Sequence, residues 1–128
     1  MIIADTHAWV WWVGARRLLS RKALHAFDSA DEIGVSVISC WEVGMLVAKR
    51  RLELDRDVET WIAQALALPR VGVLDLTPDV ALAATKFVGW RDGDPADRII
   101  VATAMAHRAS VVTKDRRIRA FSAAQAVW

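Results

Sequence analysis

Four acidic residues far apart in the chain occupy equivalent places in its pattern: Asp5, Glu42, Asp97 and Asp115. Two of them follow short apolar runs that are typical of buried strands, and two fall in the first turn of a predicted helix. In a parallel sheet, ligands bind beyond the carboxyl ends of the strands, where loops and helix N-termini converge. We therefore expect all four carboxylates at one edge of one sheet.

Carboxylates gathered in this way predict a metal site. Two of them about 5 Å apart repel by about 3 kcal/mol at an effective dielectric constant near 20, so the group must bind protons or a divalent cation. Oxygen ligands alone are what Mg²⁺ or Mn²⁺ prefers. Such an ion lowers the pKa of bound water and stabilises charge that grows on a phosphoryl oxygen. The chemistry predicted is phosphodiester hydrolysis.

Each of these acids also has a purely structural explanation. Glu42 lies three residues after Ser39, which is the spacing of a capping box. Asp94 directly precedes a proline and is better explained as a helix N-cap than as a ligand. Asp5, Asp97 and Asp115 would be stabilised at helix N-termini, as caps or by the helix dipole. Only the joint placement of the four at one sheet edge favours the functional interpretation.

The elements that must position these acids alternate along the chain. Buried or β-branched runs predict strands at residues 1–4, 34–39, 72–76, 110–113 and 123–128. Amphipathic or capped segments between them predict helices within residues 6–19, 20–31, 39–52, 57–69, 77–90, 94–109 and 115–121. Strands separated by helices, without a hairpin signal, indicate a parallel sheet covered on both faces. We expect one domain over residues 1–128, an α/β protein with a three-layer α/β/α sandwich, and a polar turn at residues 91–94.

Composition suits a compact chain in a reducing compartment. Of the 128 residues 55% are apolar, and no apolar run approaches the roughly twenty residues that span a bilayer. We expect no signal peptide and a cytoplasmic location, and the lone Cys40 to be a small buried apolar residue. The net charge is +2, and Arg supplies thirteen of the seventeen basic residues. An Arg-rich surface permits a nucleic-acid or acidic-peptide partner, although it can equally be solvated.

Other sites of chemistry lack their motifs. The three histidines show no metal-ligand spacing with cysteine or with one another, so no zinc site is predicted. Neither the phosphate-binding loop G-x-x-x-x-G-K-[ST] nor the dinucleotide fingerprint G-x-G-x-x-G occurs. Three of the seven tryptophans, Trp9, Trp11 and Trp12, fall in one short helix and cannot all face inward. We expect at least one of them at an interface.

With these residues assembled, the whole chain resembles PIN-domain ribonucleases, and in particular the VapC-type toxins of bacterial toxin–antitoxin pairs. Four stretches carry the resemblance: IIADTHAWVWW at 2–12, SVISCWEVGMLVAKRRLEL at 36–54, DGDPADRIIVATAMAH at 92–107 and VVTKDRRIRAF at 111–121. The third stretch is the most specific, since a DPxDR start followed by an apolar helix is familiar in this subgroup.

The resemblance implies a five-stranded parallel sheet and an endoribonuclease that depends on Mg²⁺ or Mn²⁺. It assigns the family's acidic positions to Asp5, Glu42, Asp97 and Asp115, with Asp5 and Asp97 the direct metal ligands. It also assigns to Thr113 a hydrogen bond with a carboxylate or a metal-bound water. The role of Asp94 stays open. Cleavage would leave 5′-phosphate and 3′-hydroxyl ends.

The resemblance further implies partners. Three cations flank the acids and are candidates to hold the RNA backbone: Arg98, Lys114 and Arg116. Family members form homodimers and are silenced by an antitoxin whose tail lies in an apolar groove. The Trp-rich first helix and the second and fourth predicted helices are candidate walls of that groove. Two alternatives are kept open: a catalytically silent module that binds RNA or antitoxin, and an α/β domain for phosphotransfer or phosphatase chemistry.

Overall fold

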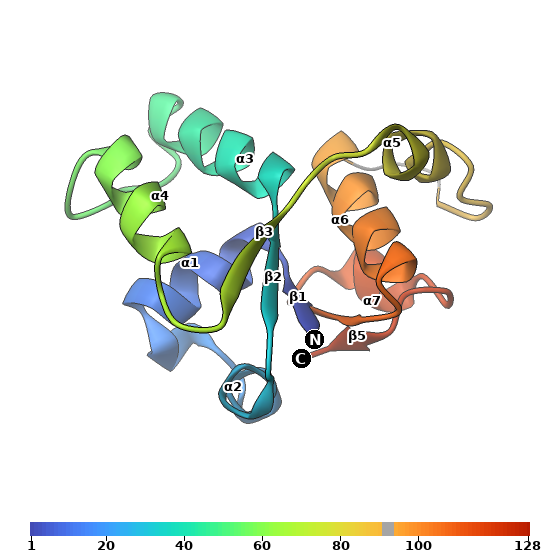
Figure 1. Ribbon diagram of the computed structural model, residues 1–128, viewed down its shortest axis with the longest axis horizontal. Helices are drawn as coiled ribbons and strands as arrows, with labels where there is room; N and C mark the ends of the chain where they lie inside the picture. The colour runs from blue at the N-terminus through green and yellow to red at the C-terminus, as the bar shows by residue number, and fades with distance from the viewer. Residues whose placement is uncertain (91–93) are drawn as a thin grey trace.

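The computed structural model describes residues 1–90 and 94–128 and follows the predicted alternation of strands and helices (Figure 1). The strands are β1 (Ile2–Ala4), β2 (Ile33–Ser36), β3 (Val71–Leu74), β4 (Ser110–Val112) and β5 (Ala126–Val127). The helices are α1 (Thr6–Gly14), α2 (Arg21–Ser29), α3 (Val37–Ala48), α4 (Val58–Leu66), α5 (Pro78–Ala84), α6 (Pro95–Ala106) and α7 (Arg116–Ala120), and η1 (Arg16–Leu18) is a 3₁₀ turn. The predicted turn at 91–94 falls largely on residues 91–93, outside the described residues.

All five strands of the sheet are parallel, in the order β3-β2-β1-β4-β5. The central strand β1 therefore pairs with two strands from distant parts of the chain: Ile3 is aligned with Gly34 of β2 and with Val111 of β4. In Figure 1, β2 runs upward into α3, so the carboxyl ends of the strands lie at the upper edge of the sheet. The predicted five-stranded parallel α/β/α architecture is confirmed.

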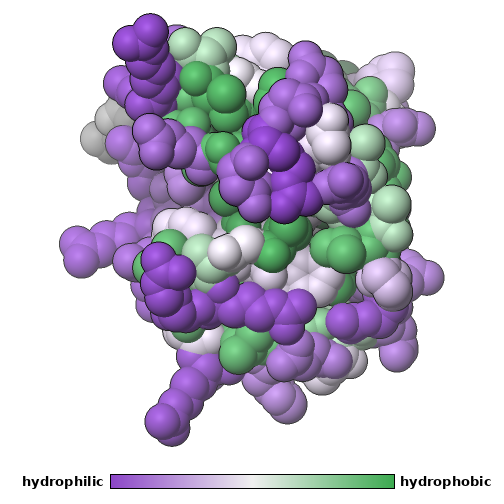
Figure 2. Space-filling view, turned by 90° about the vertical axis from the view of Figure 1, so that its left-hand side faces the viewer, coloured by the Kyte–Doolittle hydropathy of each residue, from purple (hydrophilic) through white to green (hydrophobic). Residues whose placement is uncertain are grey.

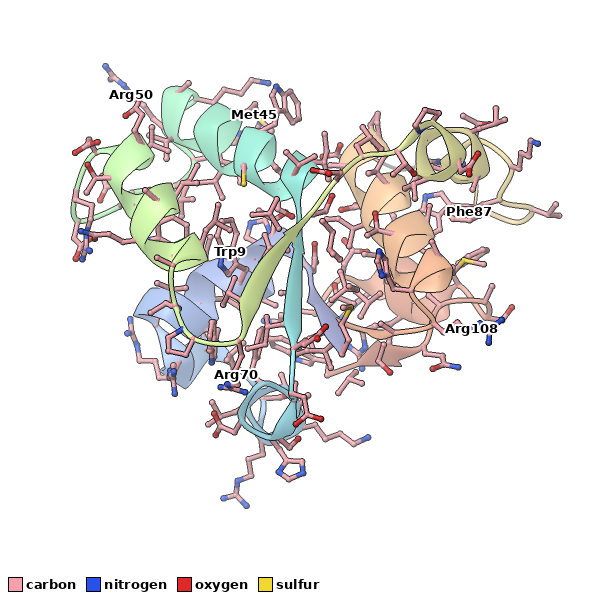
Figure 3. All side chains as sticks on the ribbon, in the orientation of Figure 1. Trp9, Met45, Arg50, Arg70, Phe87 and Arg108 are labelled. Atoms are coloured by element: carbon pink, nitrogen blue, oxygen red, sulfur yellow. The ribbon has the colours of Figure 1, made fainter. Side chains whose placement is uncertain are left out.

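Two apolar cores fill the spaces on either side of the sheet. Neighbouring residues of a strand point to opposite faces, so Ala4 and Val112 belong to one core and Ile3 and Val111 to the other. The first core is covered by α1, α2, α3 and α4, which lie to the left of the strands or below them in Figure 1, and the second by α6 and α7 on the right. Figure 3 labels Trp9, a fully buried side chain of the first core, which meets Trp61 of α4 edge to face at 5.1 Å.

Polar side chains cap the helices that begin at the carboxyl edge of the sheet. Asp5, Asp94 and Asp115 are the N-caps of α1, α6 and α7. The capping box predicted for Ser39 and Glu42 is wrong. The strand ends at Ser36 and the helix begins one residue later, so Ser36 is the N-cap of α3 and Ser39 lies inside the helix.

Among the described residues, no helix combines the length and the apolar character that crossing a bilayer requires.

Candidate active site

The four predicted acids line one cavity at the carboxyl edge of the sheet. It encloses about 620 Å³ and is lined by Asp5, His7, Trp11, Glu42, Asp94, Asp97, Lys114, Asp115 and Arg117. Most of its lining comes from residues just beyond a strand or within the first turns of the helix that follows it, whereas Asp94 and Asp97 come from the N-terminal end of α6, which follows α5. The parallel topology is therefore what brings together groups that are far apart in the sequence.

Asp5 is held in place by bonds on both carboxylate oxygens. Its Oδ1 accepts from the amide of Thr6 at 2.8 Å, which caps α1, and its Oδ2 accepts from the hydroxyl of Thr113 at 2.7 Å. The side chain is only 6% exposed, and burial raises the pKa of Asp5 although the Thr113 hydrogen bond opposes that rise. Asp5 thus combines a capping role with a carboxylate in the cavity.

Glu42 is anchored by α1 rather than by its own helix. The Thr6 hydroxyl donates to Oε1 of Glu42 and is also hydrogen-bonded to the hydroxyl of Ser39, 2.9 Å away. All three residues are buried. Burial, together with the neighbouring carboxylates of Asp5 and Asp94, raises the pKa of Glu42. The hydroxyl pair therefore fixes the position of a carboxylate that is costly to ionise in this place.

The pKa of Asp97 is strongly perturbed in the cavity. Burial, and after it the carboxylates of Asp5, Asp115, Glu42 and Asp94 in that order, together raise this pKa from 3.8 to about 8. Like charges within a few ångströms disfavour a further ionised acid, so this pattern is the one expected where carboxylates converge on one volume. Asp94 is both a lining residue and the N-cap of α6, since its Oδ1 accepts from the amide of Ala96 at 3.0 Å.

Asp115 closes the cavity on the side of α7. Its Oδ1 accepts from the amides of Arg117 and Ile118 at 2.8 and 3.1 Å, and its own amide donates to the Thr113 hydroxyl at 3.0 Å. Because Thr113 also donates to Asp5, one buried hydroxyl connects the acids that follow β1 and β4. Thr113 thus makes the kind of hydrogen bond to a carboxylate that the resemblance assigned to it.

The donor set is that of a hard divalent cation, with five carboxylates and no cysteine or histidine pair around the cavity. Across residues 1–90 and 94–128, no three acidic, histidine or cysteine side chains are already close enough together to hold an ion between them. Mg²⁺ commonly takes one or two carboxylates and keeps several water ligands, so a full protein cage is not required. The residues present fit such an ion on charge and ligand type.

Among the described residues, two cations line the cavity, Lys114 and Arg117, and only Lys114 was among the candidates predicted from the sequence. Lys114 lines it, with its Nζ 5.8 Å from the ring centroid of Trp11, and so does Arg117 of α7. Arg116 is exposed but does not line the cavity. Arg98 is turned away, because its guanidinium donates to the carbonyl of Trp90 at 2.7 Å and to that of Ala84 at 3.3 Å. Its place in the structure is that of a brace between α6 and the segment after α5.

Sequence reasoning missed several residues of this site: Thr6, His7, Trp11, Ser39 and Arg117. Thr6 and His7 follow Asp5 directly, so their position beside the first strand end was a usable signal. Arg117 lies two residues after Asp115, which is the N-cap of α7. Successive residues of a helix point in different directions, so Arg117 lines the cavity and Arg116 does not. Cys40 is half-buried against the first core, and burial raises the pKa of its thiol, in keeping with an inert side chain.

A second, apolar cavity adjoins the acidic one through Trp11, which lines both. It encloses about 690 Å³ between α1, residues 52–56 and α4, with Trp61 and Leu68 among its walls. Figure 2 looks onto the side that carries α1 and α4 and shows hydrophobic side chains exposed between hydrophilic ones. The predicted wall from the second helix is absent from this lining, because the apolar face of α2 is buried in the core through Ala23 and Phe27. Of the three clustered tryptophans, Trp9 and Trp12 are buried, which leaves Trp11 as the one at a surface.

Comparison with known proteins gives concordant matches. A family model described as the PIN domain matches residues 2–124. Ribonuclease VapC22 of Mycobacterium tuberculosis is 38% identical over 118 residues, which cover 92% of this chain and 89% of that protein.

Three solved structures share the fold. The VapBC2 complex of Rickettsia felis bound to promoter DNA has a TM-score of 0.71 at 16% identity, covering 98% of this chain and 97% of that one. A toxin–antitoxin complex of Klebsiella pneumoniae has a TM-score of 0.69 at 18% identity, covering 97% and 95%. VapC20 of Mycobacterium tuberculosis, described as a toxin that cleaves the sarcin–ricin loop, has a TM-score of 0.68 at 17% identity, covering 98% and 99%.

Proposed function

Because the chain belongs to the PIN domain family and, within it, to the VapC type of ribonuclease, we propose that it is a metal-dependent endoribonuclease and the toxin of a toxin–antitoxin pair. The observation that carries the proposal is the acidic cavity, where five carboxylates converge and the pKa of Asp97 is raised to about 8. Strongly perturbed acids in a concave site at a sheet's carboxyl edge are typical of catalytic centres.

Asp5 and Asp97 are the residues that would hold Mg²⁺ or Mn²⁺ directly, with Glu42 and Asp115 bordering the ion. When bound, the ion supplies Lewis-acid stabilisation of negative charge on a phosphoryl oxygen and lowers the pKa of water. The chain prepares this place by fixing Asp5 through Thr113 and by crowding carboxylates that the cation would relieve of mutual repulsion.

The chain's own residues handle the proton. Glu42 has a raised pKa and is held by Thr6, so it is suited to accept the proton that a water molecule loses as its oxygen attacks phosphorus. In this hydrolysis the new bond joins the water oxygen to phosphorus, and the bond between phosphorus and the 3′ oxygen breaks. The departing oxygen takes up a proton, which leaves a 3′-hydroxyl and a 5′-phosphate.

Lys114 and Arg117 are the proposed contacts for the RNA backbone. Both line the cavity beside the acids, so phosphates on either side of the reacting bond can approach without facing carboxylates alone. Arg117 can also contact one phosphate through two parallel hydrogen bonds. The reacting bond itself would lie between these cations and the acids.

The apolar cavity beside α1 and α4 is the proposed seat of an antitoxin segment. Its walls are largely hydrophobic, and Trp11 forms a shared border with the acidic cavity. A peptide lying in it could therefore extend a basic side chain to the acids and compete with the metal. The toxin–antitoxin complexes among the structures of this fold support a protein partner of that kind. The pair would act in the cytoplasm, where RNA is translated.

A second copy of the chain is the proposed cover for another apolar face. Trp41 is 57% exposed and lies one helical turn after Val37, itself 40% exposed, so the two share a face of α3. Leu76, which is 38% exposed, follows the end of β3, the strand that pairs with β2 directly before α3. Exposed apolar groups of this size gathered at one place are typical of interfaces.

The experiment that tests the proposed function is RNA cleavage by the purified protein with added Mg²⁺ or Mn²⁺. We expect cleavage that stops with chelator and in Asp5→Ala, whereas Asp31→Ala, which removes an exposed acid, retains it. Cleavage that persists under both conditions would reject the metal site. If RNA remains uncut at every metal concentration, the catalytically silent module is the better explanation.

A further inference from the structure

We propose that a third cavity, next to the acidic one, is a subsite for one unpaired nucleobase of the RNA strand. We call it the aromatic cavity; it encloses about 390 Å³ and is lined by Val88, Gly89, Trp90, Arg117, Ala120, Phe121 and Ser122. The inference rests on the proposed function, since it assigns a place to a nucleotide that flanks the reacting phosphate. Its volume falls in the range of pockets that hold small molecules.

The floor of this cavity is aromatic and firmly supported. The ring of Phe121 meets that of Trp90 edge to face, with 5.2 Å between the ring centroids, and its centroid lies 5.0 Å from that of Phe87. Trp90 is 7% exposed and packs in the second core, where its carbonyl is held by Arg98. Figure 3 shows Phe87 beside α6, on the side of the sheet away from α1 and α4. Proteins that bind single-stranded RNA stack bases on aromatic side chains held in this way.

The rim of the cavity is open and apolar. Val88 is 92% exposed among the residues that the structure describes, an unusual position for a β-branched apolar side chain. Gly89 next to it has φ of +85°, and no heavy atom lies within 4 Å of where a Cβ would be. The chain therefore bends sharply here and leaves a low edge over which a flat ring can enter.

Arg117 connects this cavity to the acidic one, because its side chain lines both. The sequence of groups across the surface is thus carboxylates, a guanidinium, then aromatic rings. A nucleotide presents a matching sequence: the reacting phosphate, a neighbouring phosphate, and a base. This order of charged groups and aromatic rings on the protein favours RNA as the occupant.

A peptide fits the same surface less well. A segment that neutralises the acidic cavity must bring positive charge, and Arg117 would repel it on the way to the aromatic cavity. The antitoxin seat proposed above is instead the cavity on the other side of Trp11, which Arg117 does not line. We therefore assign the aromatic cavity to the substrate and the apolar cavity to the protein partner.

The first test compares ligands on the unaltered protein. Nucleoside 5′-monophosphates and ribose 5-phosphate are titrated into isotope-labelled protein without metal, and the amide signals of Gly89 and Ser122 are followed by NMR. We expect the nucleotides to shift both signals and ribose 5-phosphate to leave them in place. Equal shifts with both ligands, or none with either, would overturn the proposal.

A second test fills the cavity. Ala120 is exposed on the wall, so Ala120→Trp should occupy the space without disturbing the core and abolish the base-dependent shifts. Ala123→Trp places the same ring on an exposed position outside the aromatic cavity and should keep them. Shifts that survive in Ala120→Trp contradict the assignment, and the wild-type ligand comparison stands even if that variant does not fold.

Cleavage of a short single-stranded RNA with one abasic nucleotide beside the cut site separates this inference from the proposed function. We expect KM to rise between about 5-fold and 100-fold, which is the range for loss of one base-on-aromatic contact. Arg117→Gln should raise KM for the intact RNA as well, whereas Arg119→Gln, an exposed cation of α7 that lines neither cavity, should not. Efficient cleavage that is indifferent to the abasic position would overturn the subsite alone. Base-dependent shifts in a protein that cuts no RNA would support the subsite and overturn the nuclease.

Discussion

The hydroxyl of Thr113 donates a 2.7 Å hydrogen bond to Oδ2 of Asp5, across the pairing of β4 with β1. The hydroxyl oxygen of Thr113 in turn accepts from the amide of Asp115 at 3.0 Å. Thr113 is fully buried, so this short network has no water to replace either bond. The orientation of two acids from distant parts of the chain therefore depends on one hydroxyl.

Removing that hydroxyl should weaken the metal site. In Thr113→Val the shape of the side chain is kept, but Asp5 loses its donor, and we expect metal affinity and RNA cleavage to fall by about 10- to 100-fold. Calorimetric titration with Mn²⁺ and kcat/KM for RNA measure the two effects. Thr85→Val, which removes an exposed hydroxyl at the end of α5, serves as the control. Unchanged metal affinity in Thr113→Val would show that Asp5 needs no such support.

Asp97 should make the stability of the metal-free protein depend on pH. Burial and then the neighbouring acids raise its pKa from 3.8 to about 8, so between these values the folded protein holds a proton that the unfolded chain has released. The contribution of Asp97 to the free energy of unfolding is therefore greatest below about pH 4, and it falls as the pH rises toward 8. We expect Tm without metal to decrease from about pH 5 to about pH 8, less steeply in Asp97→Asn.

The control for this prediction is Asp79→Asn, which removes an exposed acid from the first turn of α5 and should leave the slope as in the wild type. Added Mn²⁺ should raise Tm more at about pH 8 than at about pH 5, because the metal binds the deprotonated carboxylates. An identical pH slope in Asp97→Asn and the wild type would mean that Asp97 ionises normally in the folded protein.

Thr6 should matter through Glu42. The variant Thr6→Val removes the hydroxyl that holds the Glu42 carboxylate, so we expect kcat to fall by about 10-fold or more while the fold is retained. Thr6→Ser restores the hydroxyl and should recover most of the lost rate. The pH profile of kcat distinguishes positioning from packing, since its lower limb should move in Thr6→Val. A profile that keeps its shape would indicate that Thr6 is only part of the core.

Trp41 should hold two copies of the chain together. If the proposed dimer forms through this exposed ring on α3, Trp41→Arg should yield a monomer, which sedimentation or light scattering would detect. Trp11→Arg alters the tryptophan that borders the apolar and acidic cavities, away from Trp41, and should leave the oligomeric state as it is. A wild-type protein that is monomeric at all concentrations would show that the face around Trp41 is not a dimer interface.

The placement of the acids was predictable because it follows from chain topology alone. A strand that ends on Asp5 marks a place where a parallel sheet turns into a helix, and proline directly after Asp94 marks the start of another helix; the structure brings both residues to one cavity. The roles of Asp5, Glu42 and Asp97 in binding metal stay a prediction. The strand boundary was less clear, since Val37 and Ile38 continue a β-branched run that physically ends at Ser36.

Side-chain direction was beyond the sequence pattern. Arg98 and Arg117 both stand one or two residues after an acid, yet Arg98 bonds to carbonyls of the neighbouring segment while Arg117 faces the cavity. Only the packing of α6 against α5 and the turn after it decides between these outcomes. The buried bond from Thr6 to Glu42 likewise depends on how α1 meets α3.

The pairing of β1 with β4 also determines when the acidic cavity can form during synthesis of the chain. Residues around Asp5 are synthesised before their partner strand β4, and Asp115 is made after the other carboxylates that line the cavity. A nascent chain that has not yet been translated past Asp115 therefore carries no complete centre. The fold thus delays assembly of the complete acidic cavity until β4 has been synthesised and has paired with β1.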